Sequence, residues 1–257
     1  MSKRTLLLSV VASLTIVAPC IAQSGIGAQN TNPRQIMEEV QRRARSDSQH
    51  YEGTLEVIGG GNRIATKRWI YDRLGSFGAS KAVLRFVAPP EVKGVGLLIL
   101  NHPERASDQW MWRPNIGREQ RIAFQDRSTR FFGTDFSFED LEERDVGQYD
   151  FKFESDDAAA WKLESTPRKK SQYTHSYLWI GKNNYTVTRI ELYTKMGLMR
   201  AIDYRDFEQV QGVWTPRTTE IGDVTRNSRT ILKYDKLEYN VPLKDADFTL
   251  DALRRGT

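Results

Sequence analysis

The strongest constraint on the fold is a long series of short segments with the two-residue alternation of β-strands, which fills most of the chain after Tyr51. In Arg189–Tyr193 charged and apolar residues alternate, so one side of this strand should face water and the other an interior. Gly59–Asn62 and Gly181–Asn184 separate neighbouring segments with residues typical of tight turns. The pattern predicts on the order of ten antiparallel strands, a number that favours a strongly curved sheet or a barrel over a flat sheet.

One helix is predicted ahead of the strands. Asn32 is a favourable N-cap, and Gln35 stands three residues later, where its side chain can complete the cap. Apolar residues, including Ile36 and Val40, then recur with helical spacing on one face, and the helix should end near Ser46. Because the apolar face is narrow and has no aromatic residue, we expect it to pack on the protein core and not on a membrane.

The N-terminus has the features of a secretory signal peptide. A basic start precedes the apolar run Leu6–Val17, which is too short to span a membrane, and small residues follow it. We expect cleavage after Ala22, with cleavage after Ala28 as the alternative. Residues 1–22 would then be the signal peptide, and residues 23–257 would form a single domain in the periplasm.

Composition excludes several classes of function. Cys20 is the only cysteine, and Pro19 stands where a lipoprotein signal needs a small residue, so we expect no lipidation. Cleavage after Ala22 would leave a chain without cysteine, and therefore without disulfides, thiol catalysis or cysteine-metal sites. Removal of the signal peptide lowers the formal net charge from +5 to +3. The charges are mixed in sign and form no basic stripe, so we expect no nucleic-acid partner.

The sequence offers no positive sign of an enzyme. Its three histidines lack metal-ligand spacing, and it contains no nucleophile elbow, phosphate loop or zinc-protease motif. The neighbouring carboxylates Glu142 and Glu143, like Asp156 and Asp157, are typical of solvated turns. We therefore expect a protein without catalytic activity, metal or cofactor. A hydrolase with two carboxylates brought together by folding stays open as an alternative.

The stretch Asp108–Asp140 concentrates aromatic side chains among arginines. Trp110 and Trp112 should share one face of a strand. Further on, Phe131–Phe136 is too apolar for a solvated loop and too irregular for a strand, and its glycine and aspartate should shape a tight turn. These aromatic side chains must be buried, either in the protein's own core or against a ligand.

Several motifs of this region occur in the same order in a known bacterial family. They are Phe86–Pro90, Gly94–Leu98, Asp108–Pro114, Arg121–Ile122 and Phe131–Leu141. In these motifs the chain resembles the outer-membrane lipoprotein-sorting protein family, the LolA-like group. The resemblance implies a signal peptide and an α+β fold of mostly antiparallel strands. It also implies an open half-barrel, with an N-terminal helix and short helical segments over its concave face.

The same resemblance implies a carrier that holds a lipid, or the acyl chains of a lipoprotein, in an apolar hollow and carries it toward the outer membrane. Such a hollow needs apolar area, worth about 25 cal/mol per Å² removed from water. The residues expected to bind lipid are Ile36, Val40, Leu98, Trp110, Trp112, Phe132, Phe136 and Phe138. Each aromatic residue, taken alone, is more often part of a packed core.

The expected partners follow from the carrier role. They are the lipid itself, an inner-membrane transporter, which some relatives suggest is an export system of the resistance-nodulation-division type, and an outer-membrane acceptor. We expect the carrier to be a monomer. The alternative function is a lipid-responsive periplasmic sensor or regulator with the same half-barrel.

Overall fold

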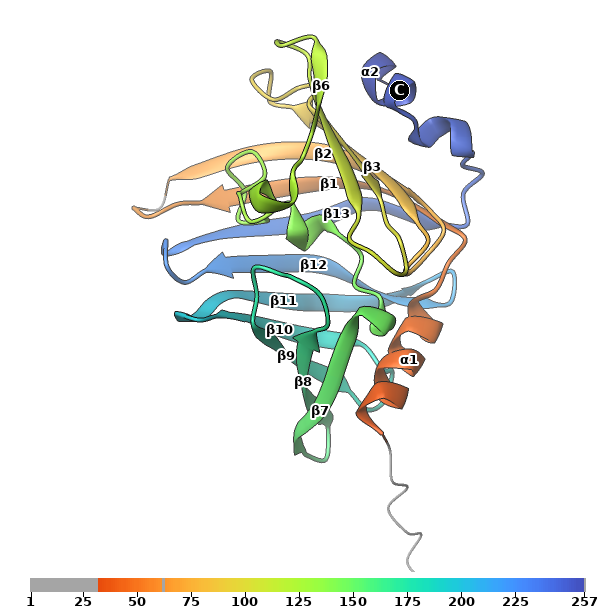
Figure 1. Cartoon of the computed structure of the whole chain (residues 1–257), viewed down its shortest axis with the longest axis vertical. Helices are drawn as coiled ribbons and strands as arrows, with labels where there is room; N and C mark the ends of the chain where they lie inside the picture. The colour runs from red at the N-terminus through yellow and green to blue at the C-terminus, as the bar shows by residue number, and fades with distance from the viewer. Residues whose placement is uncertain (1–31, 62, 257) are drawn as a thin grey trace, which may run out of the picture. The chain divides into compact units, whose positions relative to one another are not determined.

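The computed structural model describes residues 32–61 and 63–256. Thirteen antiparallel strands form one sheet within the compact unit Asn32–Thr257 (Figure 1). The helix α1 (Pro33–Ala44) precedes them. The first strands are β1 (Ser48–Ile58), β2 (Ile64–Leu74), β3 (Lys81–Ala88), β4 (Gly96–Leu100), β5 (Asp108–Arg113) and β6 (Arg118–Arg121). The later strands are β7 (Tyr149–Asp156), β8 (Ala160–Pro167), β9 (His175–Gly181), β10 (Val187–Thr194), β11 (Gly197–Val210), β12 (Val213–Asp223) and β13 (Ser228–Tyr239).

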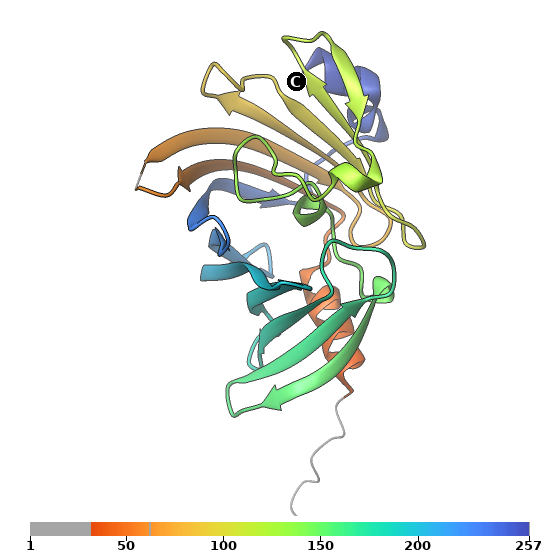
Figure 2. The same cartoon turned by 60° about the vertical axis from the view of Figure 1, so that its left-hand side comes forward.

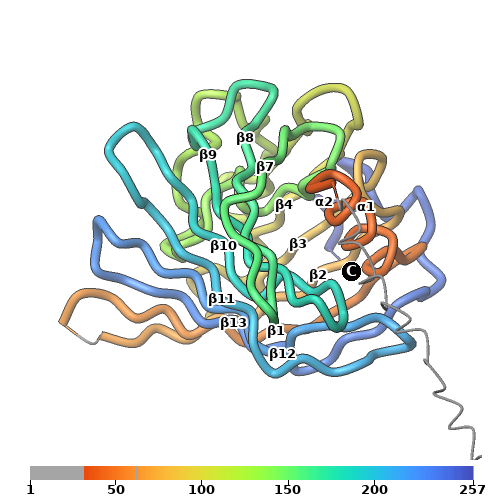
Figure 3. The backbone as a smooth tube through the Cα atoms, turned by 90° about the horizontal axis from the view of Figure 1, so that it is seen from below, coloured from red at the N-terminus to blue at the C-terminus, as the bar shows by residue number. Residues whose placement is uncertain are grey.

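The sheet is two meanders joined along one pair of strands. Its order runs β6-β5-β4-β3-β2-β1-β13-β12-β11-β10-β9-β8-β7, so each strand pairs with a sequence neighbour except where β1 pairs with β13. Within the described residues the two end strands, β6 and β7, are not paired with each other, and the sheet stays open. It is strongly curled (Figure 2 and Figure 3). The predicted open, curved antiparallel fold with an N-terminal helix is confirmed, with more strands than the sequence indicated.

The helix α1 begins as its sequence predicts. The Asn32 side chain accepts a hydrogen bond from the Arg34 amide at 2.9 Å, and the Gln35 side chain accepts one from the Asn32 amide, which completes the capping box. The helix ends at Ala44, two residues before the predicted end. Ile36 is buried in the main core, and α1 packs against β7 and β12.

Strands β4 and β5 separate two apolar clusters on opposite faces of the sheet. Leu97 and Met111 belong to the main core on the concave side, whereas Leu98 belongs to a smaller cluster on the other side. Trp110 and Trp112 pack against this smaller cluster and therefore share one face, as predicted. A strand whose two faces are both buried has a continuous apolar sequence, which explains the unbroken run in β4.

The smaller cluster is covered by the C-terminal segment of the chain. A 3-10 turn, η4 (Asp245–Phe248), leads into the short helix α2 (Leu250–Arg255), which lies outside β4, β5 and β6 (Figure 1). Arg85 donates to the Leu253 carbonyl at 2.7 Å at the C-terminal end of α2. Gly96 lets α2 approach the sheet, because a Cβ there would lie 2.8 Å from Leu253 Cδ1.

The segment Phe131–Phe136 is a tight turn held against β13, as its composition predicts. Phe132 and Gly133 both have positive φ angles, of 46° and 75°. Asp135 is fully buried and accepts hydrogen bonds from Thr230 Oγ1 at 2.7 Å and Ser228 Oγ at 2.6 Å. Arg130 forms an ion pair with the same carboxylate. The aspartate therefore anchors the turn to the sheet.

The predictions about the N-terminus lie outside the described residues. They concern the signal peptide 1–22, cleavage after Ala22 or Ala28, and the fate of Cys20. Within the described part of the chain, every helix is too short or too polar to cross a membrane.

Candidate functional site

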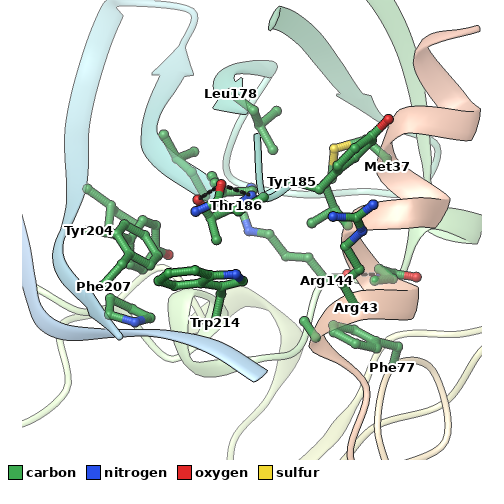
Figure 4. A pocket seen from close by; sticks show the side chains of 18 of the residues that line it. Met37, Arg43, Phe77, Arg144, Leu178, Tyr185, Thr186, Tyr204, Phe207 and Trp214 are labelled. Carbon is green, nitrogen blue, oxygen red and sulfur yellow. Dashed lines mark hydrogen bonds between the residues drawn. The ribbon is translucent and has the colours of Figure 1, made fainter. Parts of the chain in front are cut away.

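An apolar hollow of about 340 Å³ lies between α1 and the concave face of strands β9 to β12. Most of its walls are apolar side chains. In Figure 4 Trp214, Tyr204 and Phe207 lie on one side, Met37, Arg43 and Tyr185 on the other, and Arg144 between them. The remaining lining residues are Val40, Gln41, Ala44, Phe77, Asp140, Glu142, Leu178, Asn184, Thr186, Val187, Ile190, Ile202 and Pro216.

The floor of the hollow is a row of aliphatic side chains on three adjacent strands. Ile190 pairs in register with Leu178 on one side and with Ile202 on the other. Directly opposed residues on neighbouring strands point to the same face, so the alternation within each strand places all three on the concave side. Local alternation and strand register together build this continuous apolar surface.

Aromatic side chains stand where the hollow meets solvent. Trp214 on β12 lines the hollow and is still 40% exposed. Across from it, the ring of Tyr185 lies 5.1 Å from the ring of Trp161 and carries the Arg43 guanidinium 4.2 Å above its face. Tyr185 has a φ angle of 58°, in the left-handed region, within the turn between β9 and β10. The turn thus holds an aromatic side chain beside the end of α1.

Two acidic residues line the hollow, and the carboxylates of both are engaged by protein groups. Asp140 accepts hydrogen bonds from Arg200 at 3.0 Å and from the Tyr173 hydroxyl at 2.7 Å. Glu142 lies 3.1 Å from Arg127, and burial raises the pKa of its carboxyl group. Neither carboxylate is therefore a free anion facing the hollow.

The side chain of Arg144, by contrast, is not paired with a charged group among the described residues. Among the residues that the structure describes, its guanidinium has no hydrogen-bond acceptor and no carboxylate within ion-pair distance, and its nearest aromatic contact is the Tyr149 ring at 5.9 Å. Burial works against its charge, but the combined attraction of Asp140 and three tyrosines, Tyr149 first among them, raises its pKa above the ordinary arginine value. Of the two arginines that line the hollow, Arg43 is paired with Glu39 at 2.6 Å, whereas Arg144 has no ion-pair partner within the described residues.

The structure distributes the predicted lipid-binding residues over three places. Val40 lines the hollow, and Ile36 lies one turn away in the core. Phe132, Phe136 and Phe138 pack in the main core without lining the hollow. Leu98, Trp110 and Trp112 are on the opposite face, under α2. Lipid contact by these eight residues stays a prediction.

Sequence reasoning missed most of the hollow's lining. Its floor residues lie in segments that the sequence pattern predicts as strands, and the alternation in Arg189–Tyr193 indicates that Ile190 faces the interior. The density of aromatic residues suggests a ligand site in Asp108–Asp140, but in this chain it marks the packed half of the sheet.

Truncating the aromatic residues tests whether they belong to the core or to a ligand site. We expect Phe136→Ala to lower the free energy of unfolding by about 3 kcal/mol, because it removes ring contacts within the core, including Trp69 at 6.0 Å. Binding of an apolar fluorescent probe to the hollow should stay unchanged. Denaturant unfolding and probe titration measure the two effects, and Trp112→Ala under α2 should behave in the same way. Weaker probe binding without loss of stability would place these residues in the site.

Known proteins share this fold. A family model described as an uncharacterized protein matches residues 78–255. An outer membrane lipoprotein-sorting protein domain from Vibrio parahaemolyticus superposes with a TM-score of 0.82 at 24% identity, covering 87% of this chain and 98% of that one. A DUF1329 family protein from Desulfovibrio piger gives 0.81 at 24% identity, covering 86% and 97%. A LolA superfamily protein from Nitrosomonas europaea gives 0.67 at 20% identity, covering 84% and 98%. No curated protein matches the sequence. The LolA-like fold implied by the sequence motifs is confirmed.

Proposed function

We propose that this chain, which belongs to the uncharacterized family matched over residues 78–255 and has the LolA-like fold, is a non-catalytic lipid carrier. The hollow beneath α1 binds an apolar chain of a lipid or lipoprotein. The observation that supports this proposal is the hollow itself, about 340 Å³ in volume with largely apolar walls. In size it lies at the lower end of the range for small-molecule sites, roughly 300–1,000 Å³.

The energetics of such a site come from burial and not from directed bonds. Each methylene group removed from water contributes about 0.8 kcal/mol. The floor of Leu178, Ile190 and Ile202 offers no hydrogen-bonding group that would select one chain over another. A carrier of this kind accepts chains by length and volume, and it can release them when a partner offers a comparable apolar surface.

The location and partners belong to the same proposal. A secreted carrier would work in the periplasm, take its cargo from an inner-membrane transporter, such as one of the resistance-nodulation-division type, and deliver it to an outer-membrane acceptor as a monomer. The fold and the hollow are compatible with these roles. Mass spectrometry of organic extracts from gently purified protein would identify the cargo.

A series of alkyl chains tests the hollow directly. Each added methylene should strengthen binding roughly fourfold until the hollow is full, after which longer chains gain nothing. The measurement is displacement of an apolar fluorescent probe from the full chain. Quenching of Trp214 by a brominated chain would place the ligand, because this side chain lines the hollow.

The matched variants for this series are Val187→Trp and Val224→Trp. Val187 lines the hollow, so the larger side chain should fill it and weaken probe binding at least tenfold with little loss of stability. Val224 lies in the exposed turn between β12 and β13 and should tolerate the same change without effect. Equal probe binding by both variants, or no binding by the unaltered protein, would contradict the proposal.

A further inference from the structure

A second, smaller cavity adjoins the hollow. Its volume is about 60 Å³, and Glu142 and Arg144 line both spaces. Its other walls are mostly polar and include Arg127, Lys169, Lys170 and Glu139. Lys169 and Lys170 are exposed, so the small cavity lies between the apolar hollow and the protein surface. We call it the polar side cavity.

The carboxylates of the polar side cavity are already engaged by protein donors. Glu139 accepts hydrogen bonds from the Gln172 amide at 3.1 Å and from the Ser171 hydroxyl. Glu143 accepts one from the Phe77 amide at 2.9 Å and lies 3.3 Å from Arg73. Glu142 is paired with Arg127, as described above.

Among the residues that the structure describes, three cations that line the polar side cavity are not paired with carboxylates in this way. Within the described part of the chain, Arg144, Lys169 and Lys170 have no carboxylate within ion-pair distance, and Lys170 lies 5.2 Å above the ring of Phe124. The charged groups of this cavity that have no ion-pair partner among the described residues are therefore all positive. Arginine has a planar set of donors that matches a carboxylate or phosphate, and lysine adds point charges for the same anions.

The size of the polar side cavity limits what can enter it. Its volume of about 60 Å³ leaves room for a group only a few atoms in size. A carboxylate or a phosphate group is of this scale, whereas a sugar headgroup is much larger. Because Arg144 borders both spaces, an anionic group beside it would be joined to a chain lying in the hollow.

We propose that the ligand is an anionic amphiphile whose chain fills the hollow and whose carboxylate or phosphate group is bound by Arg144, with Lys169 and Lys170 closing the polar side cavity. This inference rests on the proposed carrier function and narrows its cargo. A lipid with a small anionic head fits both spaces, while the acyl chains of a lipoprotein would leave the three cations without a partner.

The headgroup test compares three single-chain amphiphiles of equal chain length in displacing an apolar probe: dodecyl phosphate, monolauroylglycerol and dodecyltrimethylammonium. We expect dodecyl phosphate to bind about tenfold or more tightly than the neutral compound, and the cationic one to bind most weakly. Inorganic phosphate alone should not displace the probe. Added salt should reduce the preference, because the two lysines are exposed. Equal binding of the anionic and neutral compounds would overturn the inference and leave the carrier function standing. Failure of all three to bind would contradict the carrier function itself.

Substitution of the three cations tests whether they cause the preference for an anionic headgroup. Arg144→Gln should remove most of the preference for dodecyl phosphate, and Lys169→Gln/Lys170→Gln should reduce it severalfold while leaving binding of monolauroylglycerol unchanged. Lys93→Gln/Arg226→Gln removes the same number of exposed charges from other turns and should change neither. If Arg144→Gln fails to fold, the headgroup preference of the double lysine variant tests the inference by itself. An unchanged preference in that variant, or an equal loss in the control, would overturn the inference.

Discussion

Replacing Arg200 with methionine is expected to lower the free energy of unfolding by about 3–5 kcal/mol. Arg200 is only 1% exposed and lies 3.0 Å from Asp140 and 3.8 Å from Asp223, both of which are almost completely buried. Its Nη1 also donates to the Tyr173 hydroxyl at 2.6 Å. Methionine has a similar length but no charge, so the two carboxylates would remain buried without their cation. Denaturant unfolding of the single variant measures the cost.

The control is a second arginine on the same strand. Arg205 pairs with Glu220 at 3.0 Å, but its side chain is 53% exposed. Water screens such a pair, so Arg205→Met should cost less than about 1 kcal/mol. Similar losses in both variants would show that Arg200 is no more buried in solution than Arg205. The comparison also concerns the hollow, because Asp140 lines its wall and is held there by Arg200.

A carboxylate introduced on α1 should mainly lower stability at one position and mainly weaken probe binding at another position one turn away. Ile36→Asp is expected to lower the free energy of unfolding by about 4 kcal/mol or more, because Ile36 is 1% exposed and packed in the main core. Val40→Asp faces the hollow, where water can reach the new carboxylate, so its loss of stability should be clearly smaller. The same change should abolish binding of the apolar probe. Denaturant unfolding and probe titration are needed for both variants.

Glu38→Asp is the control on the exposed side of the same helix and should change neither stability nor binding. Unaltered stability of Ile36→Asp would show that α1 does not pack on the sheet. Strong probe binding by Val40→Asp would move the ligand away from the hollow, and with it the proposed carrier site.

Local features of the fold could be predicted because their causes are local. The capping box of Asn32 and Gln35 is formed within four residues, and the alternation of polar and apolar residues reports which face of a strand is buried. The turn at Gly133 was predicted because it depends on φ angles that few residues adopt. The continuous apolar run of β4 was likewise a sign of burial on both faces.

The location of the site could not be predicted in this way. Trp110 and Trp112 have the apolar character of a ligand-binding wall, but α2, more than a hundred residues later, covers them. Arg144 has no sequence signal that separates it from the other arginines of its region. Among the described residues it has no ion-pair partner, because the neighbouring carboxylates pair with Arg73, Arg127 and Arg200.

The sequence by itself determined the entry helix and the antiparallel, strongly curved sheet, because periodicity and capping act over a few residues, whereas its open form was predicted only from the resemblance of its motifs to the LolA-like group. Only the tertiary structure decided which apolar face is filled and which stays hollow. That outcome depends on strand register, which aligns Leu178, Ile190 and Ile202, and on helices brought from the two ends of the described chain. One helix, α2, closes the outer face, and the other, α1, leaves a space beneath it. Burial of apolar surface favours the packing of both helices on the sheet. The shapes of the segments that meet there determine whether the space between helix and sheet is filled or stays hollow.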